Sequence, residues 1–167
     1  MANLVELTDF DGEFSIPTDQ HAEITFDEVR DERQFELLYD IMGAELAKLF
    51  IADLDSAGVP QSARFQALYN AFNEDDGNCI VKSIGIKAMV VRLVYFYYLR
   101  GNNNNATLNG NKVNLGENSA INATTGWLTR KYNEGIATAQ AIQWYICDNS
   151  TDYPEENMQA VYFKSIY

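Results

Sequence analysis

The run "MVVRLVYFYYLRG", Met89 to Gly101, decides the fold class of this chain. It is apolar almost all the way round and is interrupted by one charge, Arg92. A helix without a polar face has to be covered on every side. We therefore predict a central helix from about Cys79 to Arg100 in a mainly α domain. In a chain of 167 residues, part of that cover is expected to come from a neighbouring subunit.

Apolar residues at three- and four-residue steps predict three further helices. The predicted ranges are Thr25–Ser56, Ser62–Phe72 and Thr125–Cys147. A capping box formed by Thr25 and Glu28 marks the start of the first, and Gly43 is expected to bend it or split it in two. The fold class that follows is an antiparallel helical bundle.

The remaining segments are expected to lie outside the bundle. Residues 1–24 show no helical period and predict an extended N-terminal arm, residues 73–78 read as a loop, and residues 149–167 as a C-terminal tail. The bundle itself is assigned to residues 25–148. Within it, Asn109–Gly110 is a typical tight-turn dipeptide, which predicts one projecting β-hairpin at about 105–116. A plain solvent-exposed loop is the alternative reading of that hairpin.

Charge is unevenly distributed along the chain, whose net charge is −12. Residues 1–80 hold 18 Asp and Glu against 4 Lys and Arg, a net −14, whereas residues 81–167 hold 6 against 8, a net +2. An acidic balance argues against a conventional nucleic-acid binder, which needs a basic surface. Solubility is the simpler reading of the acidic half.

Two cysteines without paired spacing, Cys79 and Cys147, favour a reducing compartment over a disulfide framework. The opening "MANLVELTDF" lacks a signal-peptide pattern. The longest apolar run, Ala88–Leu99, is too short to span a bilayer and contains Arg92. We expect no membrane association.

Motifs that would carry chemistry were searched for and predict no catalytic, cofactor or metal site. His21 is the only histidine and lies in the predicted arm. The acidic stretches "DFDGEF" and "NEDDGN" both miss the EF-hand spacing around their glycines. The carboxylates Asp27, Glu28, Asp31 and Glu32 are more simply favourable charges in the first turns of a helix. The chain is not expected to be an enzyme.

Several segments resemble a family of small virion proteins from tailed phages of gut Bacteroidetes, including crAss-like phages. They are "ELAKLFIADL", "GVPQSARFQALYNAF", "GIKAMVVRLVYFYYLRG", "NLGENS" and "RKYNEGIATAQAIQWYICDNSTDYP", and they span about Phe35 to Tyr153. That family looks similar to head–tail connector proteins, also called head-completion or portal adaptor proteins. The resemblance implies a structural subunit of a twelve-membered homo-oligomeric ring. Its partners would be the portal protein and tail or neck ring proteins, and its location a virion assembled in the host cytoplasm.

In such a ring, DNA would pass without tight binding, and the polar, asparagine-rich hairpin would project towards the next ring or the channel. The residues expected at subunit interfaces are Tyr95, Tyr97, Tyr98, Leu108, Asn109, Val113, Leu115, Tyr162, Phe163, Ile166 and Tyr167. Two other readings stay open: another virion structural or scaffolding protein, and, from a different class, a small enzyme or carbohydrate-binding module. The last of these predicts an exposed aromatic platform or a cleft with paired acids.

Overall fold

A computed structural model describes residues 3–16, 20–75, 77, 80–102, 104–107, 110–113 and 121–155. This part of the chain is mainly helical. The α-helices are α1 (Gln20–Met42), α2 (Ala44–Asp53), α3 (Ala63–Tyr69), α4 (Ile86–Asn102) and α5 (Ile121–Asp148). The strands are β1 (Phe72–Asp75), β2 (Ile80–Ser83), β3 (Asn104–Thr107) and β4 (Gly110–Val113).

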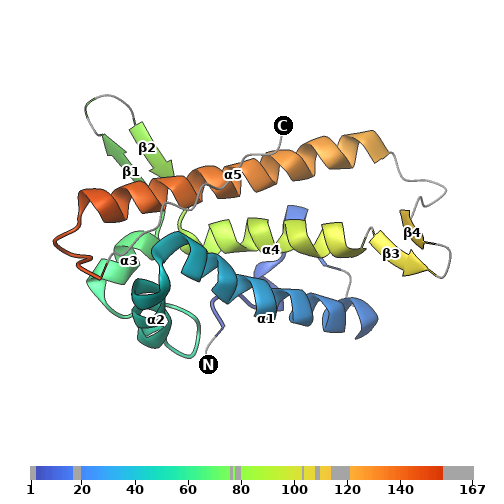
Figure 1. Cartoon of the computed structure of the whole chain (residues 1–167), viewed down its shortest axis with the longest axis horizontal. Helices are drawn as coiled ribbons and strands as arrows, with labels where there is room; N and C mark the ends of the chain where they lie inside the picture. The colour runs from blue at the N-terminus through green and yellow to red at the C-terminus, as the bar shows by residue number, and fades with distance from the viewer. Residues whose placement is uncertain are drawn as a thin grey trace.

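Helix α4 lies at the centre of the molecule, between α1 and α5, and runs antiparallel to both (Figure 1). Seven side chains in the middle of α4 are buried by the rest of the same chain. They are Val90, Val91, Leu93, Val94, Tyr95, Phe96 and Tyr98. The prediction of a helix covered all round is therefore confirmed. These seven side chains are buried without a second subunit, and the expected contact with a neighbouring subunit stays a prediction.

Part of the cover of α4 comes from the N-terminal residues of the same chain, where we expected an extended arm. Residues 3–16, here called the strap, form two short 3-10 turns, Leu7–Asp9 and Gly12–Phe14. The strap buries five apolar side chains in the common core: Leu4, Val5, Phe10, Phe14 and Ile16. Helix α1 also begins at Gln20, five residues before the predicted start at Thr25. These five side chains are irregularly spaced in the sequence, yet all of them pack in the core that the helices share. The strap is therefore part of that core.

Three carboxylates hold the strap to three different helices. Glu6 pairs with Arg30 of α1 at 3.4 Å, Asp9 with Lys87 of α4 at 2.8 Å, and Glu13 with Lys131 of α5 at 2.7 Å. Glu13 also accepts a hydrogen bond from the Trp127 indole N–H at 3.3 Å. Part of the acidic half of the sequence is thus neutralised within the chain. These carboxylates pair with cations of the body, and the side chains of Glu6 and Glu13 stay about half exposed to solvent.

Gly43 splits the first predicted helix into α1 and α2, as the sequence allowed. It takes a φ of 75°, in the left-handed region that favours glycine. The predicted end of that helix at Ser56 is close to the observed end of α2 at Asp53. The carboxylate of Asp53 accepts hydrogen bonds from the Gln61 and Ser62 N–H groups and the Ser62 hydroxyl. This network fixes the turn between α2 and α3.

The predicted start of the central helix at Cys79 is wrong. Residues 80–83 form β2, which pairs antiparallel with β1, so residues 73–75 of the expected loop belong to a strand instead. Gly85 separates β2 from α4 with a φ of 88°, and a Cβ at this position would lie 2.3 Å from the Tyr69 carbonyl oxygen. Close packing of the chain on itself therefore forces the helix to begin at Ile86.

The predicted hairpin after α4 is confirmed in its backbone. β3 and β4 pair antiparallel, with Asn104 opposite Val113 and Thr107 opposite Gly110. Gly110 lies in β4 rather than in the predicted Asn109–Gly110 turn. This hairpin extends beyond the end of α4, at the opposite end of the helices from β1 and β2 (Figure 1).

The predicted tail begins where expected, because α5 ends at Asp148. Its first residues fold back onto α3. The buried Tyr153 hydroxyl donates a hydrogen bond to the Arg64 carbonyl oxygen at 2.7 Å, and Arg64 pairs with Glu155 at 3.2 Å. Burial raises the pKa of the Tyr153 hydroxyl. Within the described residues, none of the helices is both long and apolar enough to cross a membrane.

Candidate interaction surface

Three of the aromatic residues expected at a subunit interface belong to the described part of α4, and two of them lie inside the chain. Tyr95 and Tyr98 are buried, and their rings pack edge-on against Phe14 and Phe26, with centroids 5.4 Å and 5.8 Å apart. The strap and α1 pack against their rings, and their assignment to a subunit interface stays a prediction. Tyr97 is half-buried, and the Arg33 guanidinium lies over its ring at 5.0 Å.

Most of the other expected interface residues cannot be placed. Leu108, Asn109, Leu115, Tyr162, Phe163, Ile166 and Tyr167 lie outside the described residues. Val113 lies in β4, where the structure describes the backbone but not the side chain. Their assignment therefore stays a prediction.

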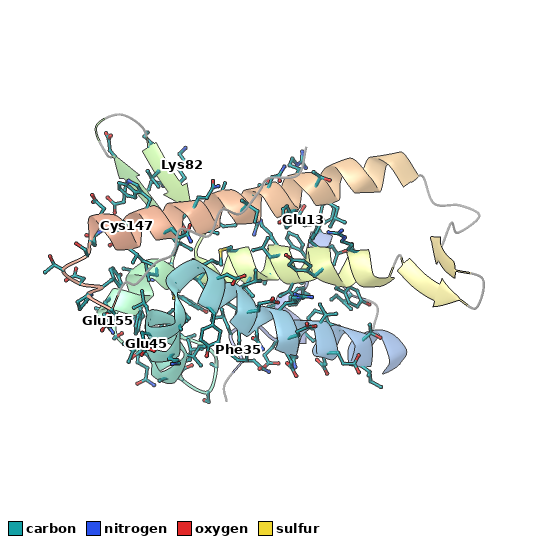
Figure 2. All side chains as sticks on the ribbon, in the orientation of Figure 1. Glu13, Phe35, Glu45, Lys82, Cys147 and Glu155 are labelled. Carbon is teal, nitrogen blue, oxygen red and sulfur yellow. The ribbon has the colours of Figure 1, made fainter. Side chains whose placement is uncertain are left out.

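A different surface gathers exposed apolar side chains: the β1–β2 hairpin together with the second half of α5. The hairpin stands beside α5 and projects from the helices (Figures 1 and 2). Phe72 of β1 anchors it, with its ring centroid 4.8 Å from that of Tyr145 of α5. Ile80 of β2 is 62% exposed, the most exposed large hydrophobic residue in the described part of the chain.

Strand register explains why polar and apolar side chains meet here. Side chains alternate between the two faces of a strand, and Asp75 lies opposite Ile80 while Asn73 lies opposite Lys82. All four of these residues are exposed. The other face carries Phe72 and Val81, which are partly buried.

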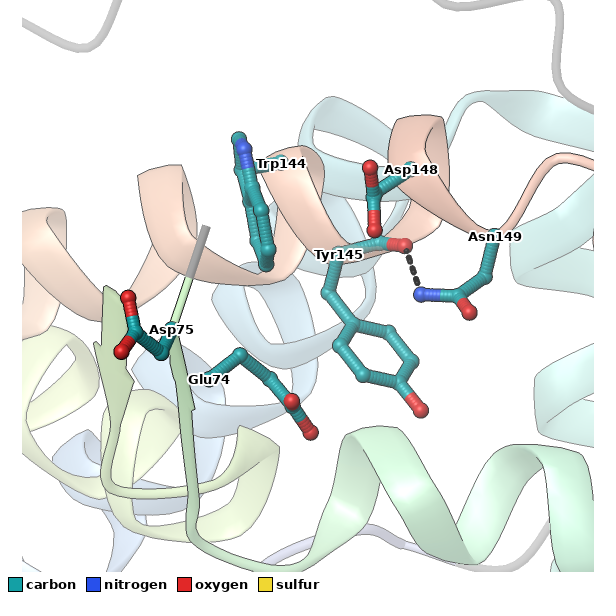
Figure 3. A pocket seen from close by; sticks show the side chains of 6 residues that line it. All are labelled: Glu74, Asp75, Trp144, Tyr145, Asp148 and Asn149. Atoms are coloured by element: carbon teal, nitrogen blue, oxygen red, sulfur yellow. Dashed lines mark hydrogen bonds between the residues drawn. The ribbon is translucent and has the colours of Figure 1, made fainter. Parts of the chain in front are cut away.

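Two adjoining hollows lie where this hairpin meets α5. The first, of about 360 Å³, is acidic and is lined by Glu74, Asp75, Trp144, Tyr145, Asp148 and Asn149 (Figure 3). The second, of about 450 Å³, is mainly apolar and is lined by Ile80, Val81, Lys82, Ala137, Gln140, Ala141 and Trp144. We call the second hollow the β2–α5 groove. Trp144 lines both, so they adjoin at its indole ring.

Electrostatics distinguish the two hollows. None of Glu74, Asp75 and Asp148 makes an ion pair with another described residue, whereas the strap carboxylates all do. Asp75 accepts a hydrogen bond from the Gly77 N–H within the hairpin turn. Burial, followed by the charges of Glu74 and Asp152, raises the pKa of the Tyr145 hydroxyl. The acidic hollow therefore presents negative charge beside a partly exposed indole.

This surface was missed from the sequence because residues 79–85 were assigned to a helix. A signal for the hairpin was present: the Asp76–Gly77 dipeptide stands between Phe72 and the β-branched pair Ile80–Val81. No signal pointed to Trp144, since an aromatic residue on a helix is more often a core residue.

The prediction that catalytic and metal sites are absent stays a prediction. In the described part of the chain, no group of three or more His, Cys, Asp or Glu side chains could hold a metal ion. The side chain of His21 and all of Cys79 lie outside the description. Comparison of the chain with protein-family models, curated proteins and solved structures finds no match.

Proposed function

We propose that the chain is a structural subunit of a tailed-phage neck, assembling into a ring that joins the capsid portal to the tail and lets DNA pass. One observation supports this best: a helical body carries a β-hairpin at each of its two opposite ends (Figure 1). Short projecting hairpins with open strand edges are suited to contacts between chains. The sequence resemblance to phage connector proteins points to the same role.

The folded monomer fits this role in a way that the sequence did not predict. The apolar side chains of α4 are buried within one chain, so a subunit is soluble before it meets its neighbours. Contacts in the ring would then come from the hairpins and from exposed groups on α5. Twelve copies are the number implied by the resemblance.

The acidic face of α1 is the surface we assign to the DNA side. Asp27, Glu28, Asp31, Glu32 and Glu36 are exposed along this helix. Arg30 is buried and pairs with Asp27 and Asp31, so it offsets part of their charge without offering a free cation to phosphate. A negative channel wall repels the duplex and allows it to slide.

Electron microscopy of assembled particles tests the proposal. Particles that contain this chain should show it as a symmetric ring between portal and tail. Deleting residues Asn109–Lys112 should leave the thermal stability of the subunit nearly unchanged, because surface loops contribute little to a core, while reducing the joining of heads to tails. The chain being absent from the neck, or a deletion with normal particle yield, would contradict the proposal.

A second candidate function, a carbohydrate-binding module, is favoured by the partly exposed Trp144 beside Glu74, Asp75 and Asp148. Sugar rings stack on indole faces, while carboxylates accept hydrogen bonds from their hydroxyl groups. Titration calorimetry of the chain with soluble oligosaccharides separates the two, since the ring subunit is expected to give no heat of binding.

A further inference from the structure

We propose that the β3–β4 hairpin of one subunit docks in the β2–α5 groove of the next copy and adds a strand to the open edge of β2. This inference rests on the proposed function and specifies the contact that would build the ring. Three features of the described residues support it: the shape of the groove, the charge around it, and the separation of the two hairpins.

The groove offers a strand edge and an apolar floor together. β2 pairs with β1 in a two-stranded sheet, so its other edge is paired with none of the described strands. The groove is lined by residues of β2 and α5 and by none of β1, which places it on that unpaired side. Ala137 and Ala141 of α5 are small, and they leave room for an incoming backbone. Edges of this kind bind extended segments through main-chain hydrogen bonds.

Charge complementarity selects the occupant. Residues 101–116, which contain the β3–β4 hairpin, carry a single charged residue, Lys112. Beside the groove stand Glu74, Asp75 and Asp148, with no ion-pair partner among the described residues. The acidic hollow lies on the β1 side of the hairpin, but Asp75 lies opposite Ile80 of β2. A lysine that β4 brings to the Ile80 end of the β2 edge is therefore attracted by Asp75.

The position of Lys82 predicts which way round the incoming hairpin lies along β2. It lines the groove and is exposed, and it lies opposite Asn73, two residues along β2 from Ile80. Like charges repel, so the incoming Lys112 is favoured at the Asp75 end and disfavoured at the Lys82 end. Such pairs set the register of an interface more than its affinity.

The hairpin cannot reach the groove of its own chain. β3–β4 and β1–β2 lie at opposite ends of the helical body (Figure 1). The 28 residues of α5, which runs between these ends, span roughly 40 Å at 1.5 Å per residue. The occupant is therefore a second copy, and the contact joins the end of one subunit to the opposite end of the next. Contacts of this head-to-tail type generate rings when the rotation between subunits closes.

A mixing experiment with the full chain tests this inference. Ile80→Lys disables the groove, because it places a cation on the β2 edge, and Lys112→Glu disables the hairpin. Each variant alone should self-associate at least tenfold more weakly than the wild type in sedimentation-velocity ultracentrifugation. Mixed in equal amounts, they should form a 1:1 dimer that grows no further, because the mixture holds one intact groove and one intact hairpin per pair.

A control and a rescue variant complete the test. Ile84→Lys changes another exposed isoleucine outside the groove and should leave association unchanged. The double variant Asp75→Lys, Lys112→Glu exchanges the two charges and should restore the association that Lys112→Glu alone loses. Circular dichroism melting confirms that each variant is folded.

The outcomes separate this inference from the proposed function. Wild-type association that is unaffected by both Ile80→Lys and Lys112→Glu overturns the inference, as does a mixture without dimers or a wild type that stays monomeric. A ring seen in particles with the β3–β4 hairpin placed elsewhere overturns the inference alone. Particles that lack a ring of this chain overturn the proposed function itself.

Discussion

The side-chain carbonyl of Gln34, fully buried in α1, accepts a hydrogen bond from the backbone N–H of Leu4 at 3.0 Å. The same amide donates to the side-chain oxygen of Asn3, also at 3.0 Å. Gln34 thus provides hydrogen-bond partners for the Leu4 N–H and the Asn3 side-chain oxygen, two polar groups that the apolar core cannot pair. Together with the three strap ion pairs, this contact turns an irregular N-terminal segment into part of the core.

Gln34→Ala should lower the free energy of unfolding by about 1–3 kcal/mol, because it leaves the buried Leu4 N–H unsatisfied. Urea denaturation followed by circular dichroism measures the change. Gln140→Ala is the matched control, since Gln140 is exposed on α5, and it should change stability by less than about 0.5 kcal/mol. Equal effects of the two substitutions would show that Gln34 does not anchor the strap.

Glu13→Gln should destabilise the protein at neutral pH but not in acid. The hydrogen bond from Lys131 lowers the pKa of Glu13 below its usual 4.5 and outweighs the opposing effect of burial, and the Trp127 hydrogen bond and the charges of Lys131 and Arg92 lower it further. A lowered carboxyl pKa contributes stability that is present above the usual pKa and lost as the pH falls through the folded value. The thermal midpoints of variant and wild type should therefore differ at pH 7 and converge near pH 3.

The control for this pH dependence is Glu45→Gln. Glu45 pairs with Lys48 on the exposed surface of α2, where an ion pair contributes little. A Glu45→Gln profile as steep as that of Glu13→Gln, or a Glu13→Gln variant as stable as wild type at pH 7, would contradict the strap pairing.

Asp40→Asn should stabilise the protein at neutral pH, whereas Glu13→Gln should destabilise it. Burial, followed by the nearby charge of Glu36, raises the pKa of Asp40 above its usual 3.8. A raised carboxyl pKa means that the ionised form destabilises the fold, and this cost disappears as the pH falls through the folded value towards 3.8. The variant should therefore melt at a higher temperature than wild type at pH 7, with the gain shrinking in acid. A lower melting temperature at pH 7 would show that the carboxylate has a favourable partner.

Gly58→Ala should unfold or displace the strap. Gly58 has a φ of 74°, and a Cβ there would lie 2.3 Å from the backbone oxygen of Asn3. Backbone cannot move aside cheaply, so we expect a loss on the order of 2 kcal/mol or more in the free energy of unfolding. Gly126→Ala, in α5 with open space around it, should instead stabilise by about 0.5–1 kcal/mol. Limited proteolysis near the N-terminus should increase for Gly58→Ala and stay unchanged for Gly126→Ala.

The isolated protein should not bind duplex DNA tightly. Its net charge is −12, and the exposed acids of α1 repel phosphate. A gel-shift titration at low salt, where electrostatic attraction is strongest, should show no complex at micromolar protein. Micromolar binding with a steep salt dependence would reverse our assignment of the α1 face.

The sequence alone determined the helical class, the central position of α4, the break at Gly43 and the hairpin after α4. Each of these follows from local information: the period of apolar residues, the conformational freedom of glycine, and a tight-turn dipeptide. The tertiary structure decided the rest. The strap has no local period, so only its contacts with Gln34 and three helices show that residues 3–16 belong to the core. Residues 80–83 form a strand because they pair with residues 72–75, and the close approach of Gly85 to the Tyr69 carbonyl oxygen separates that strand from α4. The groove beside Trp144 exists only because that strand lies against α5. The period of a sequence shows which face of a helix is apolar. Only the packing of the folded chain determines which segment covers that face.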